Sequence, residues 1–308
     1  MNNYNSILYN ESYDRKDVND MVVALKNYFK NATEGSLSSD LRWRPNLIIN
    51  EDPITAIHIH AESKLSDFWF NKLKQAKEKT GCKLFIASPI NLLGSSSTLR
   101  DLNELSATVV PLEYDERGSW TVKCVTTVPR LIYQEKWILD QKDASNLAVS
   151  QFERLKEIQD INLKGKALED LLAFLFSQIR DFEVIHTNYR TKTQEIDIVI
   201  KNKAIGGAIW GSMNSPIILI EAKNWNKPIP RYVLTDFREK VHSRKGATKL
   251  GFLITTGKFS EDLLNHELRY SFGDIVIVLI DGQQLYQLCN STNLLETLES
   301  YVTECVLR

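Results

Sequence analysis

The strongest fold signal in this sequence comes from two segments, EIDIVIK at residues 195–201 and PIILIEAKNW at residues 216–225. Each carries a short, apolar and mostly β-branched run, which is typical of a strand inside a sheet. Because side chains in a strand point alternately to its two faces, Glu221 and Lys223 lie on one face, with Ala222 opposite. A charged group buried in such a strand costs free energy unless it is paired or bound to a metal. The two segments therefore predict neighbouring strands that carry a polar site.

Strands and helices continue on both sides of these segments. In the second half, the periodicity predicts helices over 166–179, 232–243 and 260–270 and strands over 183–187, 250–256 and 274–280. In the first half, it predicts helices over 17–29 and 68–79 and strands over 46–49, 54–61, 83–87, 108–114 and 120–128. The glycines Gly206, Gly207 and Gly211 between the two deciding strands predict a hairpin. Such mixtures indicate the α/β class, with a mixed sheet flanked by helices.

The length of 308 residues predicts two domains. We expect an α/β domain over residues 1–141, a connecting helix over 142–164, and a second α/β domain over 165–308. The connecting helix is indicated by apolar residues spaced among many polar ones.

The composition is that of an ordinary folded protein, with 43% hydrophobic and 25% charged residues. The net charge of −1 does not select a partner, so any nucleic-acid surface depends on local clusters of basic residues. The four cysteines form no Cys-x-x-Cys pair, which argues against a zinc ribbon and favours a reducing compartment. The polar N-terminus and the lack of a long apolar run predict a cytoplasmic protein without a membrane span.

Three charged residues within the apolar strands point to metal chemistry. Asp197 and Glu221, on neighbouring strands, offer the hard oxygen ligands that Mg²⁺ prefers. Lys223 beside them can orient an attacking water and offset charge on a phosphate. Glu169, on the preceding helix, can supply a further carboxylate. The alternative is a structural ion pair between Lys223 and either Asp197 or Glu221.

Residues 165–288 resemble the PD-(D/E)XK nucleases, and among them the Mrr-like restriction endonucleases. The resemblance includes the helix segment GKALEDLLAFLF, the strand EIDIVI, the strand IILIEAKNW and the segment GFLITTGKFSEDLL. It implies a restriction-endonuclease-like mixed sheet, with Asp197 and Glu221 as ligands of Mg²⁺, for which Mn²⁺ can substitute. It also implies that Lys223 positions the water and that Glu169 supports the site. This chain departs from the family in the insertion AIGGAIWGSMNS and in having Glu221 where many relatives have Gln.

A cluster of basic residues follows the deciding strands. Residues 224–250 contain seven basic residues and two acidic ones, a local charge of +5. Six of the seven are our candidates for contacts with the DNA backbone: Lys227, Arg231, Arg238, Lys240, Arg244 and Lys245. The alternative is a solvated helix face. Trp225 is expected to pack at the strand end rather than to stack on a base.

The first half of the chain looks like a degenerate copy of the second. KDVNDMVVAL parallels KALEDLLAFL, PNLII parallels IDIVI, and IHIHAESK parallels ILIEAKNW. The alignment sets Asn19 at Glu169, Asn46 at Asp197, His60 at Glu221 and Glu62 at Lys223. Every candidate catalytic residue is thus replaced, which predicts a domain for binding, dimerisation or regulation. The alternative is a pattern shared by any two α/β domains. His58 and His60 lack a third ligand, so we expect them to be surface-facing or hydrogen-bonded rather than metal ligands.

These observations favour a metal-dependent DNA endonuclease of the restriction type, acting in defence. With one site per chain, cutting both strands of a duplex would need a dimer or two binding events; we expect a homodimer or larger assembly, and a partner protein is an open option. The alternatives are a repair or recombination nuclease on the same fold and a non-catalytic DNA-binding protein derived from a nuclease.

Overall fold

The structure, a computed structural model, describes residues 13–37, 43–192, 194–204, 208–268 and 274–308. It divides into two compact units between Leu131 and Ile132. Part of the predicted hairpin turn, at 205–207, and the end of the predicted helix over 260–270 lie outside the described residues.

The N-terminal unit has a six-stranded sheet in the order β1-β2-β3-β4-β5-β6. Its strands are β1 (Ala32–Thr33), β2 (Leu47–Ile49), β3 (Thr55–Ile59), β4 (Lys83–Pro89), β5 (Thr108–Tyr114) and β6 (Trp120–Val122). Its helices are α2 (Arg15–Tyr28), α3 (Asp67–Thr80), α4 (Ile90–Leu93) and α5 (Ser96–Glu104), and α6 (Val128–Glu135) crosses into the next unit. The strands β3, β4 and β5 are parallel, and the other neighbours are antiparallel.

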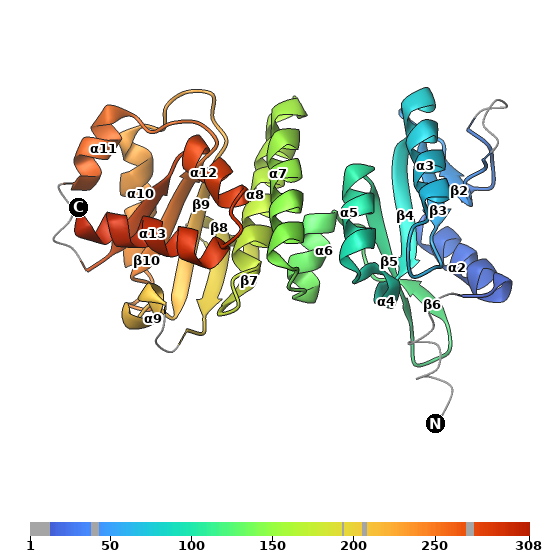
Figure 1. Cartoon of the computed structure of the whole chain (residues 1–308), viewed down its shortest axis with the longest axis horizontal. Helices are drawn as coiled ribbons and strands as arrows, with labels where there is room; N and C mark the ends of the chain where they lie inside the picture. The colour runs from blue at the N-terminus through green and yellow to red at the C-terminus, as the bar shows by residue number, and fades with distance from the viewer. Residues whose placement is uncertain (1–12, 38–42, 193, 205–207, 269–273) are drawn as a thin grey trace. The chain divides into compact units, whose positions relative to one another are not determined.

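The C-terminal unit has a five-stranded sheet in the order β11-β10-β9-β8-β7. Figure 1 labels β7, β8, β9 and β10 of this sheet. Its strands are β7 (Phe182–Arg190), β8 (Glu195–Asn202), β9 (Ile217–Lys223), β10 (Leu250–Thr255) and β11 (Val276–Ile280). Its helices are α7 (Gln141–Glu157), α8 (Ile161–Ser177), α9 (Ile209–Ser212), α10 (Arg231–His242), α11 (Glu261–Leu268), α12 (Gly282–Cys289) and α13 (Leu294–Leu307). Here β9, β10 and β11 are parallel, and β7, β8 and β9 are antiparallel. Both units therefore have the mixed α/β architecture that the sequence predicts.

Local sequence explains where the helices around the site begin. The Asp160 carboxylate accepts hydrogen bonds from the backbone of Asn162 and Leu163 at 2.9 Å and so starts α8. Asp281 and Gln284 form a capping box that starts α12. One face of the sheet is covered by α10, because Val233, Leu234, Phe237 and Val241 pack on Leu219 and Leu253. This helix is therefore placed over the strand that carries Glu221.

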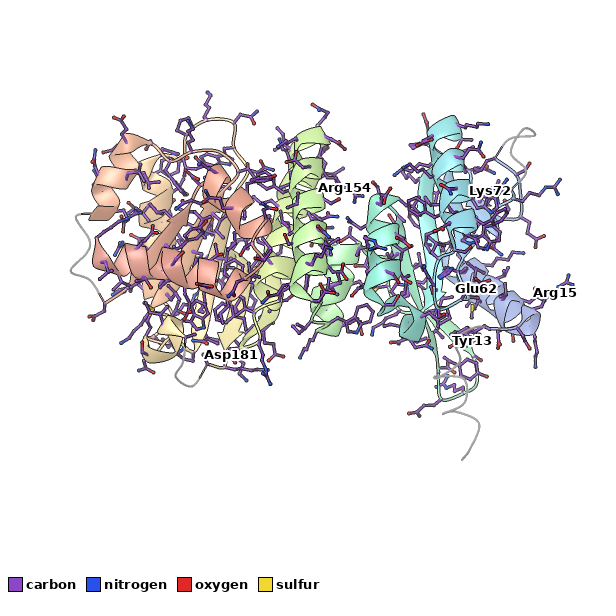
Figure 2. The ribbon with its side chains drawn as sticks, in the orientation of Figure 1. Tyr13, Arg15, Glu62, Lys72, Arg154 and Asp181 are labelled. Atoms are coloured by element: carbon purple, nitrogen blue, oxygen red, sulfur yellow. The ribbon has the colours of Figure 1, made fainter. Side chains whose placement is uncertain are left out.

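The helix α7 belongs to the C-terminal unit rather than to a connection between units. We expected the boundary near Gln141, but the units divide at Leu131, and α7 packs against α8 and α12. The reason is its apolar stripe, in which Leu147, Phe152 and Leu155 are buried. Side chains fill the spaces between these elements (Figure 2).

The two units share one topology. In each, a helix precedes three strands that pair antiparallel, and two further strands follow in parallel. The strands β1 to β5 thus correspond in order and direction to β7 to β11, and β6 is an addition at the edge. One side-chain contact recurs as well. The Asn46 Oδ1 accepts a 2.8 Å hydrogen bond from the Ile59 backbone, as Asp197 Oδ2 accepts one of 2.7 Å from the Ala222 backbone.

This correspondence corrects the sequence alignment of β3. Leu47 pairs with Ile57, as Ile198 pairs with Ile220, so the alignment of Asn46 with Asp197 sets His58 at Glu221 and His60 at Lys223. Our alignment was two residues out, with His60 at Glu221 and Glu62 at Lys223 (Glu62 is labelled in Figure 2). A shift of two residues leaves every side chain on the same face, so the alternating pattern could not detect it.

Candidate active site

The antiparallel strands β8 and β9 bring Asp197 and Glu221 together. Ile198 pairs with Ile220 in antiparallel register, so Asp197 and Glu221 lie opposite each other at the next position. Asp197 Oδ2 accepts a 2.7 Å hydrogen bond from the Ala222 backbone, so this side chain is held against β9. Lys223 is the last residue of β9 and, by the two-residue period, lies on the face of Glu221.

Glu221 is held by two lysines. The Lys223 Nζ lies 2.7 Å from one carboxylate oxygen and the Lys240 Nζ 2.7 Å from the other. The Glu221 side chain is only 7% exposed, and the Lys223 and Lys240 side chains are 21% and 17% exposed. Lys240 reaches the site from α10, because Glu221 lies two residues after Leu219 and faces that helix. Two cations therefore compensate the buried carboxylate.

The ionisable groups are perturbed by burial and by one another. Burial, and then the charge of Glu221, raise the pKa of Asp197 to about 6. Burial raises the pKa of Glu169 to about 7, although a 2.6 Å hydrogen bond from Asn188 opposes the shift. Burial disfavours the charged form of Lys223, but its pair with Glu221 outweighs this effect and raises its pKa. Such shifts within one cluster are typical of functional sites.

The donor set suits a hard divalent cation. Among the described residues, no three His, Cys, Asp or Glu side chains form a group that could hold a metal ion. Asp197 and Glu221 are two neighbouring carboxylates whose mutual repulsion a divalent cation would relieve. Mg²⁺ commonly binds one or two carboxylates and completes its shell with water and substrate phosphate oxygens. The residues present fit such an ion.

Glu169 lies near this pair but is directed to a different partner. The Glu169 Oε2 accepts a hydrogen bond from the Asn188 side chain on β7. The charge of Asp197 raises the pKa of Glu169, and the charge of Glu169 raises the pKa of Lys223. Asn188 has a positive φ of 54°, a conformation that asparagine adopts more readily than most residues. The sequence signalled Glu169 but not Asn188.

The six basic candidates have different positions. Lys240 is drawn into the active site by Glu221, which separates it from the surface residues Arg231 and Lys245. Arg244 donates to the Gln194 side chain at 2.8 Å, and Lys227 lines a cleft beside β9. Arg238 is partly buried on α10. The sequence singled out Lys240 only as one of the basic residues of this segment, because its pairing with Glu221 depends on how α10 packs on the sheet.

The corresponding place in the N-terminal unit holds no carboxylate. His58 and His60 are 5% and 2% exposed, which corrects the expectation that they face the surface or are fully hydrogen-bonded. His58 Nδ1 and His60 Nε2 are buried without a hydrogen-bond partner among the described residues. Burial lowers their pKa values to about 3 and about 4, so both are neutral. Trp43 and Trp69 pack on His58, with ring centroids at 6.0 and 4.8 Å.

The arrangement of a mixed sheet with two carboxylates and a lysine on adjacent strands is the one expected from the resemblance to PD-(D/E)XK nucleases. Residues 161–289 match the Mrr_cat family model, described as "Restriction endonuclease". This match supports the resemblance to Mrr-like restriction endonucleases that the sequence indicated for residues 165–288.

The other comparisons add little. A solved structure, "Crystal structure of protein VC1899 from Vibrio cholerae", is 12% identical over 77% of this chain and 82% of that one, with a TM-score of 0.31. No curated protein matches the chain. Within the described segments, every helix is too short or too polar to cross a membrane.

Proposed function

We propose that the protein is a Mg²⁺-dependent DNA endonuclease of the restriction type that acts in cellular defence. The observation that carries the proposal is the pairing of Asp197 with Glu221 across β8 and β9, with Lys223 at 2.7 Å from Glu221, inside a restriction-endonuclease domain. A cytoplasmic location fits this role, because foreign DNA enters there. The defence role comes from the family resemblance.

The residues divide the work of phosphodiester hydrolysis among them. Asp197 and Glu221 would hold the Mg²⁺ ion, which supplies Lewis-acid stabilisation of the phosphate and an acidified water. The ammonium of Lys223 lies where it can orient the attacking water and offset the charge that develops on the phosphate. Glu169, with its pKa raised to about 7, can exchange a proton near neutral pH.

Cutting both strands of a duplex takes either two such sites or two binding events at one site. Among the described residues, the C-terminal unit carries the pair Asp197 and Glu221, and the N-terminal unit has Asn46, His58 and His60 at the corresponding positions. We infer that the N-terminal unit is a copy of the nuclease fold without a metal site and serves DNA binding, dimerisation or regulation. A homodimer would supply the second active site.

The proposal is tested by plasmid cleavage with Mg²⁺ or Mn²⁺. We expect Asp197→Ala or Lys223→Ala to reduce cleavage at least ~100-fold, which is the usual scale for loss of a charge-stabilising group. Circular dichroism should show an unchanged fold, and EDTA should stop the wild type. Undiminished cutting by both variants would contradict the assignment of the site.

A second candidate is a non-catalytic DNA-binding protein. It is favoured by one observation, that both Glu221 oxygens are already paired with lysines, as in a structural ion-pair cluster. It predicts DNA binding that persists in EDTA and no cleavage with any metal.

A further inference from the structure

A cleft of about 360 Å³ opens directly beside the candidate active site. It lies between the turn that joins α7 to α8 and the loop that follows β9, and both belong to the C-terminal unit. Its volume falls within the range of about 300–1,000 Å³ that is typical of small-ligand pockets. Trp225 lines the cleft and follows Lys223 by two residues, so their Cα atoms are no more than ~7 Å apart.

The walls combine flat apolar surface with amide groups. Trp225 is 39% exposed and Ile161 82% exposed, both unusually open for apolar side chains. Ile158 adds to the apolar lining, and Gln159 and Asn226 contribute amides. A nucleobase is complementary to these walls. Its apolar faces stack on aromatic rings, and its polar edge forms hydrogen bonds with amides.

The charged residues that line the cleft are all positive. Lys156, Lys164 and Lys227 line it, whereas none of its lining residues is an aspartate or glutamate. Lys156 is already paired with Glu153 at 2.7 Å, but Lys164 and Lys227 have no ion pair among the described residues. Two lysines without a counter-ion beside an exposed aromatic ring are complementary to a nucleotide phosphate.

The loop that carries Trp225 is held in place by its neighbours. The Asn224 side chain donates to the Lys164 carbonyl at 3.3 Å and accepts from Thr256 Oγ1 at 2.6 Å. Gly257 packs so closely that a Cβ there would lie 2.9 Å from the Trp225 carbonyl oxygen. These contacts join the cleft to the end of β9, so a nucleotide bound in it would lie next to the candidate active site.

We propose that this cleft binds an unpaired nucleotide of the substrate strand, with its base stacked on Trp225 and its phosphates on Lys164 and Lys227. The inference rests on the proposed nuclease function and specifies its substrate: DNA with a single-stranded or extruded nucleotide beside the cleavage site. It replaces the expectation that Trp225 only packs at the strand end.

The test measures binding in EDTA, where no cleavage can occur, with the full chain. Fluorescence anisotropy compares a labelled single-stranded DNA with the same strand carrying abasic residues. We expect Trp225→Ala to weaken binding of the intact strand about 5- to 150-fold, which is the effect of losing one stacked base. The same variant should weaken binding of the abasic strand by less than ~3-fold. Trp225→Phe should retain most of the affinity, because its ring can still stack.

Matched variants isolate the pocket. Tyr232→Ala removes a more exposed aromatic residue, at 58% exposure, from α10 outside the cleft and should leave the affinity within ~3-fold of wild type. Lys164→Ala and Lys227→Ala should each make the fall of log affinity with log salt concentration less steep, by about 1 in the slope. A parallel RNA strand of the same sequence tests the choice of sugar: tighter binding of the DNA strand is expected, and tighter binding of the RNA strand would overturn the assignment of the cleft to DNA.

Equal binding by Trp225→Ala and wild type, or an equal loss on intact and abasic strands, would overturn the proposal. Failure of the nuclease function would be seen separately, as an absence of cleavage with Mg²⁺ in a protein that still shows the Trp225-dependent binding.

Discussion

Replacing Lys240 by Met tests whether the second lysine stabilises Glu221. The substitution keeps most of the aliphatic stem and removes the ammonium that lies 2.7 Å from Glu221. Glu221 then keeps Lys223, so the loss is that of one charged hydrogen bond and not of the whole cluster. Such a bond contributes about 1.5–3 kcal/mol. Both side chains are less than one fifth exposed, so solvent screening reduces this value little.

The assay is urea unfolding of the purified chain at neutral pH, with EDTA and with saturating Mg²⁺. In EDTA, we expect Lys240→Met to lower the free energy of unfolding by about 1.5–3 kcal/mol. Mg²⁺ should raise the stability of the variant more than that of the wild type, because the oxygen that Lys240 occupied becomes free to bind the ion.

The exposed Lys201 provides the control, since Lys201→Met should change stability by less than ~0.5 kcal/mol. If Lys240→Met unfolds like this control in EDTA, the ion pair does not stabilise the protein. If Mg²⁺ stabilises the variant and the wild type equally, Lys240 does not compete for the oxygen at which the ion binds.

Two further predictions concern stability. In the folded protein the pKa values of His58 and His60 are about 3 and about 4, below the ordinary 6.5. Their contribution to the free energy of unfolding is therefore complete above pH 6.5 and is lost as the pH falls towards the folded pKa values. At pH 5, the expected loss of stability is about 2 kcal/mol for each histidine, and urea unfolding at pH 8 and pH 5 measures this loss. A His58→Gln variant whose stability has the same pH dependence as that of the wild type would contradict the prediction. Gly282→Ala should destabilise by about 1–3 kcal/mol, because its Cβ would collide with the Thr256 carbonyl. Gly165→Ala, in a helix with open space around it, should stabilise by about 0.5–1 kcal/mol, and thermal melts that fail to separate the two glycine variants would refute this reasoning.

Asp197, Glu221 and Lys223 could be selected from the sequence because the signal is local. A charged residue inside an apolar strand is expensive to bury, and the two-residue period sets its face without knowledge of any neighbour. The helices, the succession of strands along the chain and the restriction-endonuclease resemblance follow from patterns of the same local kind. The division between the units and the membership of α7 depend instead on which surfaces pack together.

Packing and register also decided what the sequence could not specify. Lys240 pairs with Glu221 because the packing of Phe237 and Val241 on the sheet fixes which side of α10 faces the strands. The local sequence does not determine this orientation of the helix about its axis. His58, not His60, corresponds to Glu221, because cross-strand pairing sets the register and a two-residue slip is invisible to the pattern. The cleft at Trp225 joins segments about 60 residues apart in the chain, whose contact is shown by the hydrogen bond between Asn224 and Lys164. Local periodicity thus determined the strands and the charged residues they bury, while only the tertiary structure determined which distant side chains share a site.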